Sequence, residues 1–266
     1  MTRKRNIRIV VEYDGTNLYG WQLQKDKPTV QGELQRALQE IEGRKVLVIG
    51  SGRTDAGVHA EGQVANFHTS SPLPSRKWPD ALNAHLPPEI AVIGAMEVPL
   101  AFHAQYGATS KTYRYRVLNR VVRGALDRLR SHLVKAPLDV SKMQEAAKVL
   151  VGTHDFRSFG SEMSKKEKTI RTICSFEVSP RPPFVDFVVT GDGFLYNQVR
   201  SMVGTILRVG VGSEPVEWIR TVLEAKDRTR AGANVPARGL TLVEVKYDGK
   251  PKCRPGAESP AKKEEE

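Results

Sequence analysis

The sequence GRTDAGVHA, residues 52–60, is the most informative stretch of this chain. It follows an apolar, β-branched run, Lys45–Ile49, whose composition is typical of a buried strand. Glycines then interrupt the run, and glycine permits turns and close approaches that other residues do not. We therefore expect Asp55 to lie on a tight loop at the end of a strand, where protein scaffolds commonly place reactive groups.

Strand and helix patterns alternate on both sides of this loop. Strands are predicted where β-branched and aromatic residues alternate with polar ones, and helices where apolar residues recur every three or four positions. The predicted strands are Ile7–Tyr13, Gly62–Thr69, Glu89–Val98, Lys111–Leu118, Thr172–Ser179, Phe184–Thr190 and Leu240–Tyr247. The predicted helices are Val30–Ile41, capped by Thr29, then Trp78–Leu86, Ser141–Val151, Phe194–Val209, and Glu214–Lys226, capped by Ser213.

This order of elements indicates an α+β fold made of two halves, residues 1–105 and 106–248, that share a mainly antiparallel sheet with a central cleft. The tail, residues 249–266, is rich in Pro, Lys and Glu and is predicted to be disordered. No apolar run has the length of a membrane span, and the basic N-terminus leads into a strand pattern rather than a signal peptide. These features predict a cytoplasmic protein.

The charge is strongly basic and unevenly distributed. The chain has a formal net charge of +11, of which residues 106–248 contribute +9 from 24 Lys and Arg against 15 Asp and Glu. A basic surplus of this kind favours an acidic partner such as nucleic acid, although it also fits a merely soluble surface.

Asp55 is the first candidate for chemistry. An aspartate on such a turn often only bonds its own backbone. Arg53, two residues earlier, could instead pair with it or stabilise a nearby anion. A partnered carboxylate stays ionised and can act as nucleophile or base.

The run KTYRYR, residues 111–116, supplies the next candidates. On a strand, Tyr113 faces opposite to Arg114. Tyr113 could belong to the core or could stack on a base, which is worth roughly 1–3 kcal/mol. Residues 111–135 hold eight Lys and Arg against one acid, so Lys111 and Arg114 are candidate phosphate contacts.

Arg200 lies in an amphipathic pattern, where it could extend to solvent or pair with a carboxylate in a cleft. Spacings typical of zinc sites, P-loops, dinucleotide loops or a serine nucleophile elbow are absent from the sequence. The sequence therefore predicts neither a metal nor a cofactor.

Residues 52–60 resemble the active-site signature of the tRNA pseudouridine synthase A family, and further stretches resemble other family motifs in the same order. These stretches are Glu12–Gly15 with Tyr19–Gln22, Phe102–Ala104 with Lys111–Tyr115, Asp155–Phe156 with Ser158–Phe159, Asn197–Gly204, and Ala225–Arg228 with Gly239–Leu240. The resemblance covers about residues 6–247. It departs from the family at Gln105, where relatives commonly have Arg, and at Ala60, where many have Gly.

The resemblance implies a pseudouridine synthase fold with two ferredoxin- or RRM-like halves. It implies isomerisation of uridine to pseudouridine at positions 38, 39 and 40 of the tRNA anticodon stem-loop, without metal or cofactor, by a homodimer. By resemblance Asp55 is the catalytic acid, Arg53 helps to flip the base, Arg200 pairs with Asp55, Tyr113 stacks on the uracil and Leu240 packs against it.

Two other classes of function fit the sequence less well. A non-catalytic RNA-binding module would not need a carboxylate facing a polyanion. A carboxylate-dependent hydrolase would need a second acid, a metal cluster or an activated serine, and none accompanies Asp55 at recognisable spacing.

Overall fold

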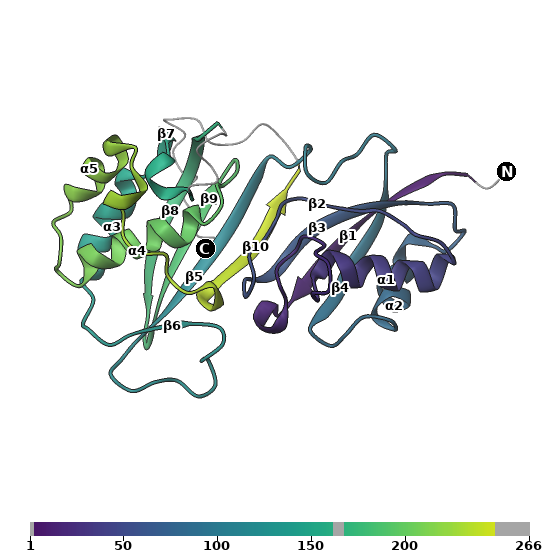
Figure 1. Ribbon diagram of the computed structural model, residues 1–266, viewed down its shortest axis with the longest axis horizontal. Helices are drawn as coiled ribbons and strands as arrows, with labels where there is room; N and C mark the ends of the chain where they lie inside the picture. Colours follow the sequence, from purple (N-terminus) through teal and green to yellow (C-terminus); the bar gives the residue numbers. More distant parts are fainter. Residues whose placement is uncertain (1–2, 162–167, 248–266) are drawn as a thin grey trace, which may run out of the picture.

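The computed structural model describes residues 3–161 and 168–247, so the predicted disordered tail lies outside the described residues. Within these ranges it contains ten strands and five α-helices (Figure 1). The strands are β1 (Arg5–Tyr13), β2 (Val48–Gly50), β3 (His59–Thr69), β4 (Ile90–Val98), β5 (Ser110–Asn119), β6 (His132–Val134), β7 (Gly152–Asp155), β8 (Ile170–Arg181), β9 (Phe184–Gly191) and β10 (Leu240–Lys246). The helices are α1 (Val30–Glu42), α2 (Trp78–Asn83), α3 (Val140–Val149), α4 (Gln198–Gly210) and α5 (Trp218–Ala225).

All described strands belong to one sheet. Its main path runs β4-β1-β3-β10-β5-β9-β8-β7, with β2 paired to β3 and β6 paired to β5. The pairs are antiparallel except β3 with β10 and β5 with β6. The α+β class and the mainly antiparallel sheet are thus confirmed.

The last strand of the chain lies in the middle of the sheet, where β10 separates β3 from β5 (Figure 1). Helices α1 and α2 accompany the strands before residue 105, and α3, α4 and α5 accompany the later strands (Figure 1). The parallel pairing of Thr241 with His59 joins the two groups of strands. The loop that carries Asp55 leads directly into β3, so it lies at this junction.

Local sequence signals explain the first helix. Thr29 accepts a hydrogen bond from the Gly32 N–H at the start of α1, and Gly43 ends the helix in the left-handed conformation with φ of 67°. Four apolar positions of the helix, Val30, Leu34, Ala37 and Leu38, are fully buried, and Ile41 near its end is partly buried. Cap, stripe and terminator therefore act together, as predicted.

Two helices begin later than predicted. The predicted helix from Phe194 begins at Gln198, because Asn197 has φ of 65° and interrupts the helical backbone. The predicted helix from Glu214 begins at Trp218, and Ser213 is not its cap. The Ser213 N–H instead donates to the Arg208 carbonyl, which completes the end of α4.

The predicted strand over Lys45–Ile49 is shorter than expected and covers only Val48–Gly50. Two short strands, β6 and β7, were not predicted, because three or four residues carry too little periodic signal. In the described part of the chain, none of the helices is both long and apolar enough to cross a membrane.

Candidate active site

The loop between β2 and β3, residues 51–58, carries Asp55, and we refer to it as the Asp55 loop. The end of β1 and the segment that follows it hold this loop through side-chain and backbone hydrogen bonds. The Tyr13 hydroxyl lies 2.8 Å from the Thr54 hydroxyl, and the Trp21 N–H donates to the Thr54 carbonyl at 3.1 Å. Within the loop, the Val58 N–H donates to the Asp55 carbonyl at 3.1 Å. The backbone on both sides of Asp55 is therefore fixed.

Two glycines allow this close packing. Gly20 has φ of +82°, and a Cβ on it would overlap the Thr54 carbonyl oxygen. A Cβ on Gly15 would overlap the Val58 carbonyl oxygen. Larger residues at either position would push the preceding segment away from the Asp55 loop, which explains why glycine occupies both.

Arg200 on α4 contacts the Asp55 carboxylate, with 3.4 Å between Nη1 and Oδ2. Its guanidinium also donates to the Val235 carbonyl at 2.8 Å and to the Asn197 side-chain oxygen at 2.9 Å. Both members of the pair are largely buried, each with 18% of its side chain exposed. Arg200 is thus oriented by three oxygen acceptors and does not extend freely to solvent.

Burial and charge act in opposite directions on Asp55. Removal from water raises the pKa of this carboxyl above its ordinary value, because burial disfavours the charged form, and the neighbouring Arg200 opposes the rise. Burial is the larger effect, so the net direction is upward. The site therefore contains a partly desolvated carboxylate with a single cationic partner.

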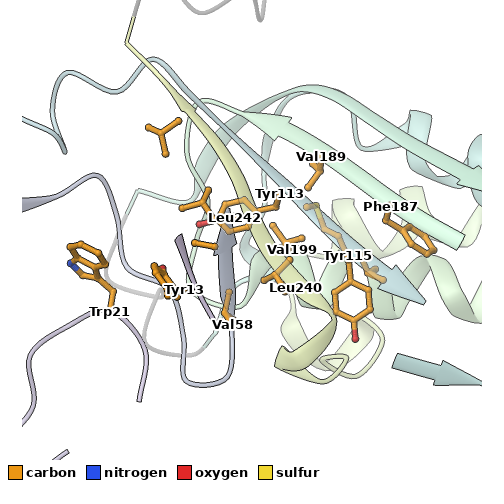
Figure 2. Packing of buried hydrophobic residues seen from close by; sticks show 14 of the residues in the cluster. Tyr13, Trp21, Val58, Tyr113, Tyr115, Phe187, Val189, Val199, Leu240 and Leu242 are labelled. Atoms are coloured by element: carbon orange, nitrogen blue, oxygen red, sulfur yellow. The ribbon is translucent and has the colours of Figure 1, made fainter. Parts of the chain in front are cut away.

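Tyr113 and Leu240 come from the neighbouring strands β5 and β10. Tyr113 is 8% exposed and meets the ring of Phe194 edge to face, with 5.2 Å between ring centroids. Its pKa is raised by burial, and the nearby Tyr13 and Asp55 add to the rise. Figure 2 shows Tyr113, Leu240 and Val58 among the side chains that gather at the junction. The structure thus places Tyr113 near Asp55, and it places Leu240 on the strand that pairs with the strand of Tyr113.

Arg53 does not pair with Asp55. It is exposed, and its Nε donates to the Gln22 side-chain oxygen at 3.2 Å. An ion pair between the two residues was one alternative from the sequence, and the structure does not contain it. An exposed Arg53 on the rim of the Asp55 loop is available to contact a nucleic acid.

The two candidate phosphate contacts have partners within the protein. The Lys111 ammonium donates to the Ser51 carbonyl at 2.8 Å, and burial, with a smaller contribution from Arg171, lowers its pKa. Arg114 pairs with Glu61 at 2.5 Å. Phosphate contacts by these residues stay predictions, and Lys111 has a second role in holding the start of the Asp55 loop.

His59 is a residue of the site that the sequence did not single out. It is 5% exposed, and its Nδ1 accepts the Gly15 N–H at 3.1 Å. Its Nε2 lies 2.9 Å from the Leu129 carbonyl and 3.2 Å from the Arg238 carbonyl, so Nε2 carries the proton. The only sequence signal was its position at the end of the Asp55 loop.

Comparison with known proteins decides the family. The family model described as tRNA pseudouridine synthase matches residues 9–107 and 146–248. The chain belongs to this family. It is 46% identical to "tRNA pseudouridine synthase A" of Acetivibrio thermocellus over 91% of this chain and 100% of the relative, and 44% identical to the protein of that name from Thermoanaerobacter sp. (strain X514) with the same coverage. It is 44% identical to "tRNA pseudouridine synthase A 2" of Clostridium tetani over 92% of this chain and 99% of the relative.

Membership of the tRNA pseudouridine synthase family confirms the resemblance inferred from the sequence and makes the protein an isomerase that acts on tRNA. Among the described residues, no group of three or more His, Cys, Asp or Glu side chains is arranged to hold a metal ion. At the Asp55 loop, Asp55 supplies a carboxylate, Arg200 a guanidinium and Tyr113 a buried phenol.

Proposed function

We propose that this tRNA pseudouridine synthase acts on uridines 38, 39 and 40 of the anticodon stem-loop and that Asp55 is its catalytic residue. The observation that carries the proposal is the position of the Asp55 carboxylate, on a backbone-fixed loop, 3.4 Å from Arg200. Family membership and the basic second half of the chain support the choice of substrate.

The reaction is an isomerisation, so no atoms are gained or lost overall. The glycosidic bond from the ribose to N1 of the uracil breaks, a bond to C5 forms, and the hydrogen of C5 is released to solvent while N1 gains one. Asp55 either attacks the sugar or base as a nucleophile or removes a ribose proton. Both routes use its ionised form, which the charge of Arg200 favours.

The target bond lies inside a base stack, so the nucleotide must first leave the stack at a cost of a few kcal/mol. Stacking on an aromatic side chain returns about 1–3 kcal/mol per base, and we assign this contact to Tyr113. Leu240, 5% exposed on the adjacent strand, packs against the uracil. The exposed Arg53 assists the departure of the base from the stack.

Release of tritium from tRNA that carries 5-tritiated uridine tests the proposal. The wild-type protein is expected to release tritium, and Asp55→Ala to lower the rate by at least about 100-fold. If the wild type released no tritium, the proposed activity would be wrong. If both proteins released it equally, the role assigned to Asp55 would be wrong. Mapping of the modified positions tests the choice of 38, 39 and 40.

A cytoplasmic location and a homodimer belong to the same proposal. A pool of tRNA in the cytoplasm is the natural substrate of such an enzyme, and the absence of a spanning helix among the described residues is compatible with it. Light scattering of the purified protein measures the oligomeric state, and a mass of one chain, 29.5 kDa, would contradict the homodimer.

A further inference from the structure

Residues 120–131, between β5 and β6, form an exposed basic loop that we call the arginine loop (Figure 1). It contains four arginines and one acidic residue, Asp127, for a net charge of +3. It also exposes aliphatic side chains, with Leu126 94% exposed and Val121 73% exposed. The arginines are Arg120, Arg123, Arg128 and Arg130.

The loop has a defined shape although it contains no regular element. Arg120 donates to the Val122 carbonyl at 2.8 Å, and Arg128 donates to the Ala125 carbonyl at 2.9 Å. The Ser131 hydroxyl donates to the Asp127 carbonyl at 2.8 Å. These bonds hold the side chains of Arg120, Arg128 and Ser131 against the backbone of the loop itself.

The C-terminal end of the arginine loop is tied to the residues that support the Asp55 loop. Arg130 pairs with Asp14 at 3.1 Å, and the Leu129 carbonyl lies 2.9 Å from Nε2 of His59. Asp14 precedes Gly15, which packs on the Asp55 loop, and His59 follows that loop directly. The C-terminal end of the arginine loop therefore lies against the residues that flank the Asp55 loop.

The charge of the loop favours a polyanion over a second protein chain. Among the residues that the structure describes, Arg123 and Arg128 have no carboxylate within ion-pair distance. The loop also lies between the two matched ranges of the family, residues 9–107 and 146–248, so the family match assigns it no role.

We propose that the arginine loop is a docking surface for the phosphodiester backbone of the RNA beside the nucleotide that enters the site. The proposal rests on the proposed function for its substrate, but it concerns binding and not the chemical step. Phosphate contacts of this kind contribute affinity that falls as salt rises, because each contact releases condensed counterions.

Binding of a tRNA transcript, measured by fluorescence anisotropy at several salt concentrations, tests the proposal. The double variant Arg123→Gln/Arg128→Gln leaves the ties through Arg130 and His59 in place and removes, within the loop, only the Arg128 side-chain bond to the Ala125 carbonyl. We expect its Kd to rise about tenfold near physiological salt and its log Kd–log salt slope to fall by about 1.5, the loss of two phosphate contacts. Turnover at saturating tRNA is expected to stay close to that of the wild type.

Two control variants separate charge from structure. Arg123→Lys/Arg128→Lys keeps the charges and is expected to restore most of the affinity. Arg76→Gln/Lys77→Gln removes two exposed charges beside α2, which packs on the edge strand β4, and is expected to leave the slope unchanged.

An unchanged Kd and slope in Arg123→Gln/Arg128→Gln would overturn the proposal, as would a change of oligomeric state with unchanged RNA affinity, which would assign the loop to a protein contact. Because binding is measured without turnover, a wild type that binds tRNA through the loop and forms no pseudouridine would contradict the proposed function alone.

Discussion

The ionisation of Asp55 depends on two neighbours with opposite effects, its apolar surroundings and Arg200. In Arg200→Gln the raising effect of burial on the Asp55 pKa is no longer opposed, so this pKa rises further. A smaller fraction of the enzyme then holds Asp55 as a carboxylate at any given pH. We expect the acidic limb of the kcat/KM profile, measured by tritium release, to move to higher pH.

Arg200→Lys is the matched control, because it keeps the positive charge and loses only the guanidinium geometry. Its acidic limb should lie nearer to that of the wild type, even where its rate is lower. An acidic limb that stays in place in Arg200→Gln would contradict an electrostatic role for Arg200. Thermal unfolding of both variants identifies a loss of fold.

The residue types in the sequence identified the candidate site residues. Which side chains and carbonyl groups those residues contact is known only from the fold. The sequence left Arg200 between solvent and a carboxylate, and the choice depends on a contact between residues 145 positions apart. Arg53 is two positions from Asp55 and yet bonds Gln22. His59 was missed because its partners, Gly15, Leu129 and Arg238, come from three distant segments.

At the scale of elements, α4 packs closely against the segment of Ala233 and Val235 because Gly204 has no side chain. A Cβ on Gly204 would overlap the Ala233 carbonyl oxygen, and the same segment supplies the Val235 carbonyl that orients Arg200. We expect Gly204→Ala to separate α4 from this segment, lower the free energy of unfolding by about 1–3 kcal/mol and reduce tritium release.

Gly94→Ala in β4 is the matched control, since a Cβ at that position would meet no atom within 4 Å. It should leave stability and activity near those of the wild type. Urea denaturation gives both free energies of unfolding. Equal stability of the two alanine variants would mean that α4 and the segment of Ala233 and Val235 adjust without cost, and the account of their packing would be wrong.

Element boundaries were predictable where a cap, a periodic stripe and a terminator agree, as in α1. The predicted boundary was wrong where apolar residues at helical spacing continue past a residue whose backbone is not helical, as at the start of α4. Leu195 continues the apolar spacing of α4 and is buried, yet Asn197 breaks the helix between them. Burial of an apolar side chain therefore does not require that its backbone be helical, and periodicity alone places the start of such a helix too early.

At the scale of the whole molecule, the order of strands was beyond the reach of the sequence patterns. The pairing of β10 with both β3 and β5 joins residues more than a hundred positions apart, and nothing in a single strand specifies its neighbours. The two halves that the sequence indicates, residues 1–105 and 106–248, therefore share hydrogen-bonded backbone across their boundary, and this sharing predicts how the protein unfolds.

If the first half unfolded alone, β10 would lose its neighbour β3, and if the second half unfolded alone, β3 would lose its neighbour β10. In either case a strand edge would be exposed to water and to aggregation. We therefore expect a single cooperative transition, although chains of this size often unfold in stages. Tryptophan fluorescence separates the halves, because Trp21 and Trp78 lie in the first and Trp218 lies in the second.

In Trp218→Phe, fluorescence reports only the first half, and in Trp21→Phe/Trp78→Phe it reports only the second. Each variant serves as its own control when its fluorescence is compared with far-ultraviolet circular dichroism, which sees both halves. In each variant we expect the urea midpoint from fluorescence to equal the midpoint from dichroism. The reason is that the sheet cannot lose β3 or β5 from beside β10 without exposing that strand. If the fluorescence midpoint differs from the dichroism midpoint in either variant, the prediction is wrong. The sheet would then consist of two independent folding units that meet at the β3–β10 pair.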